Sequence, residues 1–457
     1  MKGNSIYFVL GLVCISLTTS VLGDTAANCT FDDAVGEWNI ELYEFNHEKT
    51  IDTSKRICTF EFTFMYPNYV TNKAGRFGLW TMIYNQGFEA TIDNRKWLFL
   101  FWNDFKNSFD CSKTLVHWTY DHTVRQWYNF VAHKSSSLKG LQQLQTSTET
   151  SLSAKNLLYR PSHAYISTLN KLQSSWKATH YREYEKMTLA ELKRRAGTPI
   201  YSKPPKPAPI NAELEKMVAG LPNEFDWRKP SDGGPSYVTP VRSQKECGSC
   251  YAFASAAALE ARIQVFTNRS VRPILSPQDV VDCSKFSEGC NGGFAYLIAG
   301  KYGMVSGFVE ESCNPYQGHE TGKCSTSRKC KRYYTADYRY IGGYYGACNE
   351  ALMKMELIHR GPFPVGIMVY DDFMSYKSGV YRHTGLNDPL NRFNPFQLTN
   401  HAVLLVGYGY DKQLKLPYWT IKNSWGESWG ENGYVRILRG QDEIAVESLG
   451  VSFNPVF

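Results

Sequence analysis

Runs of apolar and aromatic residues, separated by turn residues, dominate the chain from Asp24 to about Lys134. The run RFGLWTMIY is almost continuously apolar, which is typical of a strand buried on both faces. The runs FEATI and KWLFLFW flank Asp93, Asn94 and Arg95, and this arrangement predicts a hairpin. Several such runs in succession predict an all-β unit, either an antiparallel barrel or a sandwich.

The pattern then changes from strands to helices. Residues 135–150 are rich in Ser, Thr and Gln and have little apolar periodicity, which is typical of a flexible, protease-sensitive linker. Tyr165, Leu169, Leu172 and Trp176 follow at helical spacing, so we expect them on one face of a helix.

A second short helix is predicted just before a boundary. Thr188 and Glu191 form a capping-box pattern, basic residues fill the last turn, and Gly197 is placed to end the helix. The Pro-rich stretch TPIYSKPPKPAP cannot continue a helix, so it marks the end of this helical region.

The segment from Leu221 to Phe457 is larger and changes character midway. Its first half is rich in cysteine and helix-bearing, whereas its second half contains strand-like runs such as FPVGIMV, HAVLLVGYGY and PYWTIKNSWG. A helical half followed by a β half predicts an α+β domain of two lobes, with a cleft between them.

The first residues have the features of a secretory signal peptide. Lys2 supplies a positive charge, an apolar stretch runs from Ile6 to Leu17, and Val21 and Gly23 occupy the small-residue positions of a cleavage site. An uncleaved anchor is the alternative. We expect cleavage after Gly23, a mature protein without membrane insertion, and a new N-terminus at the following aspartate.

Charge and cysteine content agree with a secreted or lumenal protein. The net charge of +7 comes from basic residues spread along the chain, which argues against a nucleic-acid partner. One of the 12 cysteines lies in the signal peptide, so an odd number remains, most of which should pair in an oxidising compartment. Two sequons make Asn28 and Asn268 candidate glycosylation sites.

Cys247 and Cys250 are three residues apart, a spacing that fits a redox dithiol, half a zinc site, or a nucleophile beside a structural disulfide. An Ala-rich, helix-forming run follows Cys250, and Ser249 is a plausible N-cap. The helix dipole would there stabilise a thiolate. A zinc site needs a second ligand pair, and Cys283 and Cys290 are too far apart to supply it. No βαβ unit precedes the motif to support the redox reading, so we expect a nucleophile and no metal.

A nucleophile needs a base and a group that orients the base. His401 opens the buried run HAVLLVGYGY, and Asn423 lies in IKNSWGESWGENGY. The Asn oxygen can hold one imidazole nitrogen while the other faces the thiol, and Trp425 or Trp429 could shield that bond from water. Either residue alone would be better explained as a core histidine or a turn asparagine, but their joint presence with Cys250 favours catalysis.

The motifs QKECGSCYAF, CNGG, LTNHAVLLVGYG and IKNSWGESWGENGY resemble the papain family of cysteine proteases, from Leu221 to the C-terminus. The resemblance implies a catalytic domain made of a helical lobe and a β-barrel lobe. It also implies that Gln244 donates a hydrogen bond to the oxyanion beside the Cys250 N–H. Gly292 and Gly293 would line the cleft and let a substrate backbone approach, although an ordinary glycine turn is the alternative.

The whole chain is similar to the dipeptidyl-peptidase branch of this family, through YNQGFE, SWKATHYREYE, GGYYGACNEALMK and HTGLNDP among other stretches. In that branch the β unit is an exclusion domain that closes the non-primed end of the cleft. Its N-terminal aspartate, which matches Asp24, binds the α-amine of the substrate, so that dipeptides are released. The alternatives are a disordered Asp24, an endopeptidase with an unrelated N-terminal domain, and a non-catalytic binding protein.

The resemblance also implies processing, assembly and a bound anion. Chloride would bind low in the S2 pocket near Tyr296 and Tyr340, with no metal or organic cofactor. The enzyme would reach the lysosome through the secretory pathway, be activated by another protease and assemble as a homotetramer. The expected parts are a signal peptide (1–23), a β-barrel exclusion domain (24–135), a helical propeptide (136–220), a heavy chain (221–387) and a light chain (388–457).

The family pattern implies the disulfides Cys29–Cys111, Cys247–Cys290, Cys283–Cys324 and Cys313–Cys330. The chain departs from this pattern at Cys58, whose partner should follow Trp127, where Tyr128 stands instead. A second departure is Asn387, at a heavy/light cleavage site where a basic residue is usual. We therefore expect Cys58 to be unpaired and the processing site to be unusual.

Overall fold

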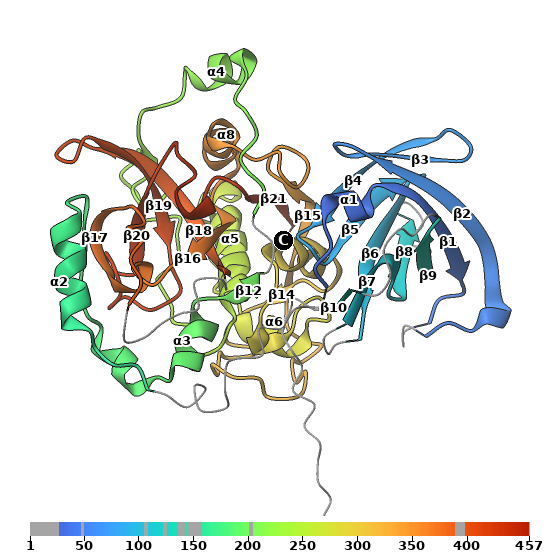
Figure 1. Ribbon diagram of the computed structural model, residues 1–457, viewed down its shortest axis with the longest axis horizontal. Coiled ribbons are helices and arrows are strands. Elements are labelled where there is room, and N and C mark those ends of the chain that lie inside the picture. Colours follow the sequence, from blue (N-terminus) through green and yellow to red (C-terminus); the bar gives the residue numbers. More distant parts are fainter. Residues whose placement is uncertain are drawn as a thin grey trace, which may run out of the picture.

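The computed structural model describes residues 27–46, 50–104, 108–121, 126–135, 142–143, 158–200, 204–388 and 398–456. Residues 27–135, the N-terminal barrel, lie beside a two-lobed C-terminal domain formed by residues 221–456 (Figure 1). The middle segment, residues 158–220, runs around the C-terminal domain, with its first helix (His163–Leu172) on the side away from the barrel (Figure 1). In the part of the chain described, no helix is long and apolar enough to cross a membrane.

The N-terminal barrel is a closed ring of eight antiparallel strands, as the sequence predicted. In the order β1-β2-β3-β4-β5-β6-β8-β9 each strand pairs with the next, and β9 pairs back with β1. The strands of the ring are β1 (Gly36–Tyr43), β2 (Arg56–Met65), β3 (Tyr69–Asn72), β4 (Phe77–Ile83), β5 (Gly87–Ile92), β6 (Arg95–Asn103), β8 (His117–Asp121) and β9 (Trp127–Lys134). Two further strands, β7 (Ser108–Thr114) and β10 (Gln142–Gln143), lie outside this order, and the short helix α1 (Phe31–Ala34) precedes β1.

Aromatic rings fill the barrel and fix its register. Phe88 and Phe99, from neighbouring strands, stack with their ring centroids 4.5 Å apart. The predicted hairpin is confirmed, because β5 and β6 pair through a turn in which Asp93 and Asn94 have positive φ. The prediction of a fully buried strand at RFGLWTMIY is wrong for its first half, because β4 lies at the surface there and exposes alternate residues.

The middle segment contributes strands as well as helices. Its elements are α2 (His163–Leu172), β11 (Trp176–Ala178), the 3-10 turn η3 (Arg182–Lys186), α3 (Leu189–Arg195), β12 (Thr198–Ile200) and α4 (Ala212–Val218). The capping box of Thr188 and Glu191 is confirmed at the start of α3. Both strands join the sheet of the C-terminal domain, β11 through β17 (Tyr376–Tyr381) and β12 through β18 (Leu398–Asp411).

The predicted helical face of α2 is wrong at its C-terminal end. The helix ends at Leu172, which is exposed, and Trp176 begins β11 instead. The side chain of Gln173 turns the chain by accepting a hydrogen bond from the Trp176 N–H and donating one to its carbonyl. The buried indole of Trp176 then donates to the Arg382 carbonyl of the C-terminal domain, 2.9 Å away.

The C-terminal domain has a helical lobe and a β lobe. The helices are α5 (Cys250–Phe266), α6 (Pro277–Cys283), α7 (Gly303–Val305) and α8 (Glu350–Arg360), with a π-helix, η5, at Tyr296–Tyr302. The remaining strands are β13 (Phe225–Asp226), β14 (Phe308–Val309), β15 (Arg332–Tyr340), β16 (Phe363–Val369), β19 (Leu416–Lys422), β20 (Tyr434–Leu438) and β21 (Val451–Val456), and short 3-10 turns lie at Thr53–Lys55, Gly289–Asn291, Phe373–Ser375 and Glu443–Ala445.

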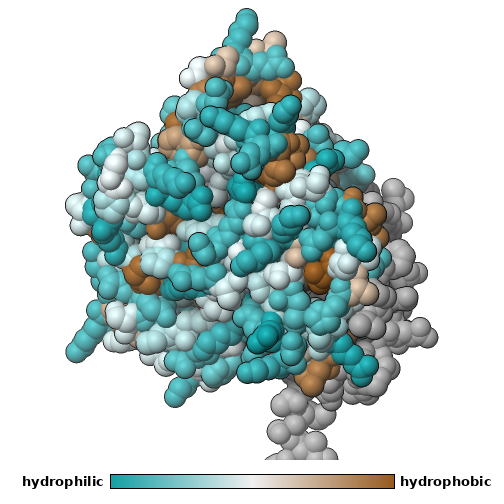
Figure 2. All heavy atoms as spheres, turned by 90° about the vertical axis from the view of Figure 1, so that its left-hand side faces the viewer, coloured by the Kyte–Doolittle hydropathy of each residue, from teal (hydrophilic) through white to brown (hydrophobic). Residues whose placement is uncertain are grey.

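Helix α5 lies in the centre of the molecule (Figure 1) and packs against β18 of the β lobe. It is buried from Cys250 to Gln264, so it is a core helix rather than an amphipathic surface helix. The side of the molecule that carries α2 and β17 is mostly hydrophilic, with apolar atoms in small separate groups (Figure 2).

Candidate active site

Cys250 is the first residue of α5, as the helix-forming run predicted. Its side chain is buried and makes no disulfide. The position at the helix N-terminus is the one at which backbone N–H groups and the helix dipole stabilise a thiolate. Ser249 occupies the N-cap position, but its hydroxyl does not cap the helix. It bonds instead to the Tyr316 hydroxyl at 2.6 Å, and Tyr316 in turn donates to the Gln244 carbonyl.

His401 and Asn423 meet in the β lobe. His401 lies on β18, and Asn423 directly follows the neighbouring strand β19, so the pairing of the two strands brings them together. The imidazole Nε2 is 2.8 Å from the Asn423 Oδ1, and the ring of Trp425 covers the histidine with its centroid 4.9 Å away. Both residues are buried.

The free nitrogen of His401 is the one that could exchange a proton with a thiol. Nδ1 is buried and has no hydrogen-bond partner among the described residues. The pKa of His401 is lowered to about 4, mainly by burial. The hydrogen bond with Asn423 acts to raise this pKa, and the charge of Arg195 acts to lower it. The ring is therefore neutral at physiological pH in this form of the protein, and able to act as a base.

Gln244 is held with its amide group beside the nucleophile loop. Its Oε1 accepts a hydrogen bond from the Ser424 hydroxyl at 2.6 Å, which fixes the orientation of the amide. Its Nε2 donates to the Cys247 carbonyl at 2.9 Å and to the Arg195 carbonyl at 3.3 Å. The Arg195 carbonyl belongs to the middle segment, outside the C-terminal domain. A substrate carbonyl could accept the same hydrogen bond from Nε2.

The middle segment crosses this site. After α3 the chain turns at Gly197, which has a φ of 115°, and continues as β12. Thr198 pairs with Asn400, the residue before His401. The Arg195 carbonyl accepts hydrogen bonds from both Gln244 and the Trp425 indole, the latter at 3.1 Å. The structure is thus that of a precursor whose own chain lies over the candidate catalytic residues.

Gly292 and Gly293 lie in the turn after Cys290. Gly292 has a φ of 132°, and its carbonyl accepts a hydrogen bond from the Glu288 N–H. A side chain on Gly293 would place its Cβ 2.7 Å from the ring of Tyr251, so packing alone requires glycine there. The role of these two residues in binding a substrate remains a prediction.

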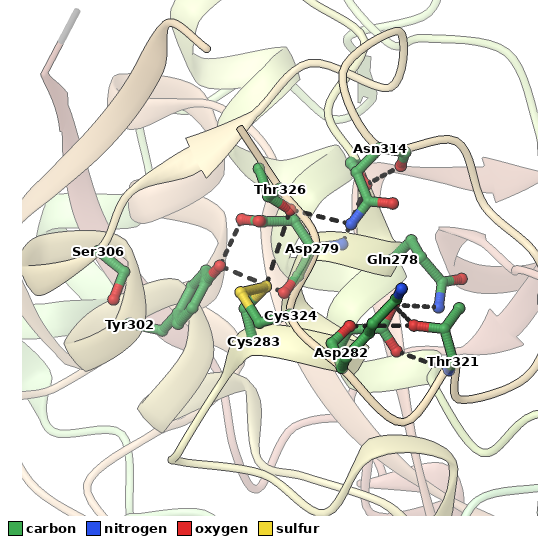
Figure 3. Close-up of a disulfide and its surroundings, with 12 residues drawn as sticks. Gln278, Asp279, Asp282, Cys283, Tyr302, Ser306, Asn314, Thr321, Cys324 and Thr326 are labelled. Atoms are coloured by element: carbon green, nitrogen blue, oxygen red, sulfur yellow. Dashed lines mark hydrogen bonds between the residues drawn. A yellow bond between two sulfur atoms is a disulfide. The ribbon is translucent and has the colours of Figure 1, made fainter. Parts of the chain in front are cut away.

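The four disulfides of the structure are Cys29–Cys111, Cys247–Cys290, Cys283–Cys324 and Cys313–Cys330, the pairs that the resemblance implied. Cys247–Cys290 joins the loop before Cys250 to the turn that carries the two glycines. Figure 3 shows Cys283–Cys324, which ties the end of α6 to a loop that Asp282 also holds, through hydrogen bonds from Thr321.

The cysteines of the described chain that form no disulfide are Cys58, Cys250 and Cys348. Cys58 lies on β2, and both Cys58 and Tyr128 pack against the core of the barrel. The Arg95 guanidinium stacks over the Tyr128 ring, with its central carbon 4.8 Å from the ring centroid. Burial raises the pKa of the Cys58 thiol, so its thiolate is disfavoured.

The N-terminal barrel contacts the C-terminal domain next to the glycine turn. Tyr84, between β4 and β5, packs its ring on Phe294, the residue after Gly293, with 4.2 Å between ring centroids. The Tyr345 N–H donates to the Thr81 hydroxyl at 2.8 Å. The barrel therefore contacts the C-terminal domain beside Gly292 and Gly293.

A buried ionic cluster holds the same two parts together, and the sequence analysis did not identify it. Glu89 of β5 accepts hydrogen bonds from Tyr296 at 3.0 Å and Tyr338 at 2.6 Å, and forms an ion pair with Lys96 at 3.1 Å. Burial acts to raise the pKa of Glu89, but Lys96 and Lys301 outweigh it and hold that pKa below its usual value. A charged residue inside the apolar run FEATI was the available signal.

The chloride prediction can be tested against this cluster. Tyr296 and Tyr340 stack with 4.3 Å between ring centroids, and the Tyr296 hydroxyl is used by Glu89. The Tyr340 hydroxyl is buried without a hydrogen-bond partner among the described residues. A buried hydroxyl donor of this kind fits an anion. In the described chain, no group of three His, Cys, Asp or Glu side chains could hold a metal ion.

Several predictions concern residues outside the described chain, and two concern glycosylation sites within it. Asp24 and the signal peptide lie outside the described residues, as do residues 389–397 after the expected heavy/light boundary. Asn28 is half-exposed, and its Oδ1 accepts a hydrogen bond from Asn85, which leaves Nδ2, the atom to which a glycan attaches, outside that bond. Asn268 is exposed. Glycosylation at both remains a prediction.

Comparison with known proteins agrees with this geometry. Residues 221–453 match the papain family cysteine proteases, and residues 24–134 match the cathepsin C exclusion domain. Cathepsin C of Schistosoma mansoni is 48% identical over 456 residues, which cover 97% of each chain. Cathepsin B-like cysteine proteinase 4 of Caenorhabditis elegans is 31% identical over 330 residues, which cover 65% of this chain and 94% of the relative.

Two solved structures of similar fold are also precursors. Procathepsin B S9 from Trypanosoma congolense has a TM-score of 0.53 and 27% identity, and covers 65% of this chain and 98% of its own. The proform of the ragweed pollen cysteine protease Amb a 11 has a TM-score of 0.50 and 27% identity, and covers 64% of this chain and 84% of its own. The chain therefore belongs to the papain family of cysteine proteases and, through its exclusion domain and its likeness over nearly the whole length, to the cathepsin C group within it.

Proposed function

We propose that the chain is the zymogen of a lysosomal cysteine exopeptidase that removes dipeptides from the free N-termini of peptides and proteins. The observation that carries the proposal is the contact of Tyr84 with Phe294, beside Gly292 and Gly293. This contact supports a barrel that closes one end of the substrate cleft, where only the end of a peptide would then enter. An endopeptidase needs a cleft that is open at both ends.

The chemistry proceeds through an acyl-enzyme. The Cys250 thiolate attacks the scissile carbonyl carbon, and His401, which holds the thiol proton on Nδ1, gives that proton to the leaving amine. Asn423 keeps the imidazole oriented through Nε2. Gln244 Nε2 and the Cys250 N–H stabilise the oxyanion, each by about 3 kcal/mol. Water then hydrolyses the thioester with His401 as the general base.

The anchor for the substrate is the carboxylate of Asp24, once signal cleavage makes this residue the N-terminus. It would pair with the protonated α-amine of the substrate in a charge-assisted hydrogen bond worth about 1.5–3 kcal/mol. Two substrate residues then fit between the anchor and Cys250, so the product is a dipeptide. An acetylated substrate has no charged amine and loses this contact.

Maturation and assembly complete the proposal. A second protease removes the middle segment, because the Arg195 carbonyl of that segment holds the Gln244 amide that the oxyanion needs. The chain is also cut near residues 387 and 388. The Tyr340 hydroxyl, which has no hydrogen-bond partner among the described residues, would donate to a chloride ion. The signal peptide and the four disulfides support passage through the secretory pathway, and the mature enzyme assembles as a homotetramer.

The test is to mature the enzyme in vitro with a separate endopeptidase and compare a dipeptidyl-amide substrate with its N-acetylated form. We expect kcat/KM to be at least about tenfold higher on the free amine, which is the fold-change equivalent to 1.4 kcal/mol. Asp24→Ala should abolish most of that preference. Equal rates on both substrates, with no effect of Asp24→Ala, would instead establish an endopeptidase with an unrelated N-terminal domain.

A further inference from the structure

The turn between β4 and β5 binds the main chain that leads to Asp24. The side-chain amide of Gln86 accepts a hydrogen bond from the Ala27 N–H at 3.2 Å and donates one to the Ala27 carbonyl at 2.8 Å. This two-way contact imitates the pairing of neighbouring β-strands. It fixes both the position and the direction of the backbone at Ala27, which is completely buried.

Asn85 continues this attachment over the next two residues. Its carbonyl accepts a hydrogen bond from the Cys29 N–H at 3.0 Å, and its Nδ2 donates to the Asn28 side chain at 3.1 Å. Gln86 also donates to the Asn85 side chain at 2.7 Å, so the two amides orient each other. Three consecutive residues of the N-terminal arm, residues 27–29, are thus held by two adjacent turn residues.

The same turn contacts the C-terminal domain. Tyr84, immediately before Asn85, packs on Phe294, the residue after Gly293. Only Thr25 and Ala26 stand between Asp24 and Ala27, so a fully extended chain can carry the Asp24 Cα no farther than about 11 Å from the Ala27 Cα. The attachment of Ala27 therefore limits where the Asp24 carboxylate can lie relative to the Gly292–Gly293 turn.

We propose that Gln86 is a positioning residue for the exopeptidase reaction, supported by Asn85. It acts on the substrate only through the N-terminal arm, by placing the Asp24 carboxylate two residues from the scissile bond. The inference rests on the proposed function, since it assumes that Asp24 binds the α-amine of a peptide substrate. The YNQG turn is then part of the specificity device and more than a hairpin connection.

The test uses the matured full chain and measures kcat and KM on a free-amine dipeptidyl amide and its acetylated form. Gln86→Ala should lower kcat/KM on the free amine about tenfold, mainly through KM, because two hydrogen bonds that position the anchor are lost. It should leave the slow hydrolysis of the acetylated substrate unchanged. The control is Gln126→Ala, an exposed glutamine of the same barrel, which should change neither substrate.

A double variant distinguishes positioning from general damage. If Gln86 acts through Asp24, then Gln86→Ala combined with Asp24→Asn should be no worse than Asp24→Asn alone. Losses that multiply, an equal fall on both substrates, or full retention of the free-amine preference in Gln86→Ala would each overturn the inference. Failure of the proposed function is a separate result, because it shows in the unmodified enzyme as equal rates on the two substrates.

A second variant covers the case in which Gln86→Ala does not fold. Gln86→Glu keeps the acceptor for the Ala27 N–H and removes the donor to the Ala27 carbonyl. This variant should raise KM for the free-amine substrate several-fold. It should also speed hydrogen exchange at the Ala27 and Cys29 amides. Wild-type KM and exchange in this variant would also overturn the inference.

Discussion

Two parts of the chain cover the C-terminal domain, and they are attached by different chemistry. The middle segment is held by strand pairing and by hydrogen bonds to main-chain carbonyls, among them one from the Arg195 guanidinium to the Trp425 carbonyl at 2.6 Å. Tyr181 donates to the Tyr376 carbonyl at 2.6 Å and Tyr184 donates to the Met374 carbonyl at 3.2 Å. The N-terminal barrel is held by a buried carboxylate between two lysines, with tyrosine hydroxyls donating to it.

The difference agrees with the proposed fate of each part. Hydrogen bonds to main-chain carbonyls can be replaced by water one at a time, at a small net cost for each. A buried carboxylate and its lysines are coupled, because removing one partner while the others stay buried leaves an uncompensated charge, which costs about 3–5 kcal/mol. In the proposed function, the segment that is removed would thus be held by separable contacts, and the barrel that stays would be held by a coupled cluster.

The largest expected effect is the loss of the buried carboxylate. Glu89→Gln leaves the ammonium groups of Lys96 and Lys301 buried without their counter-charge, and should lower the free energy of unfolding by about 3–5 kcal/mol. Chemical denaturation of the precursor measures this effect. Glu37→Gln, at an exposed position of the same barrel, is the control and should change stability by less than about 0.5 kcal/mol. Similar stability of the two variants would show that the ionic cluster does not hold the barrel.

Acidification should loosen the middle segment through His401. The pKa of His401 is lowered to about 4 by burial, and an exposed imidazole has a pKa near 6.5. A base whose pKa is lowered in the closed form stabilises that form fully above pH 6.5, and this stability is lost as the pH falls toward 4. At pH 5 the loss is about 2 kcal/mol.

Hydrogen exchange at the amides of β12 measures this loosening in a Cys250→Ser precursor. Burial raises the pKa of Asp371 to about 7, beside Lys193 of the middle segment, and this carboxyl acts in the opposite sense. The comparison is therefore with Cys250→Ser combined with His401→Gln, in which the acid-induced increase should be smaller. Identical pH profiles in the two proteins would exclude His401 as the source.

The smallest effect is expected for single hydroxyls of the middle segment. Tyr181→Phe leaves the Tyr376 carbonyl and the Gly430 N–H, which donates to the Tyr181 oxygen at 2.7 Å, without a partner. It should weaken the attachment by about 1–2 kcal/mol and speed proteolytic maturation. Tyr184→Phe breaks one longer bond and should have a smaller effect. A larger effect of Tyr184→Phe would contradict the view that these contacts act separately.

The sequence predicted much of the local structure around the candidate catalytic residues. Cys250 begins its helix, Asn423 directly follows the strand that pairs with that of His401, and both the hairpin at Asp93 and the capping box at Thr188 are present. Local patterns and motifs determine these features, because each depends on residues close together in the chain or on a spacing that the family shares.

What the sequence could not supply depends on contacts between distant residues. Trp176 lies in β11 and not in the predicted helix, because it pairs with a residue of β17. Glu89 is buried by contacts with the C-terminal domain, which no local pattern in the sequence predicts. Gln86 contacts Ala27 across a separation of 59 residues, and no periodicity predicts such a pair. In the proposed function, such tertiary contacts would decide which peptides reach the nucleophile.

The most direct test of the account uses two ten-residue peptides that differ only in an N-terminal acetyl group, each incubated with the matured enzyme and followed by mass spectrometry. The account predicts that the free peptide shortens in steps of two residues from its N-terminus, while the acetylated peptide stays intact over the same time. Internal cleavage of the acetylated peptide at a comparable rate would show that the barrel does not close the cleft, and would contradict the central claim.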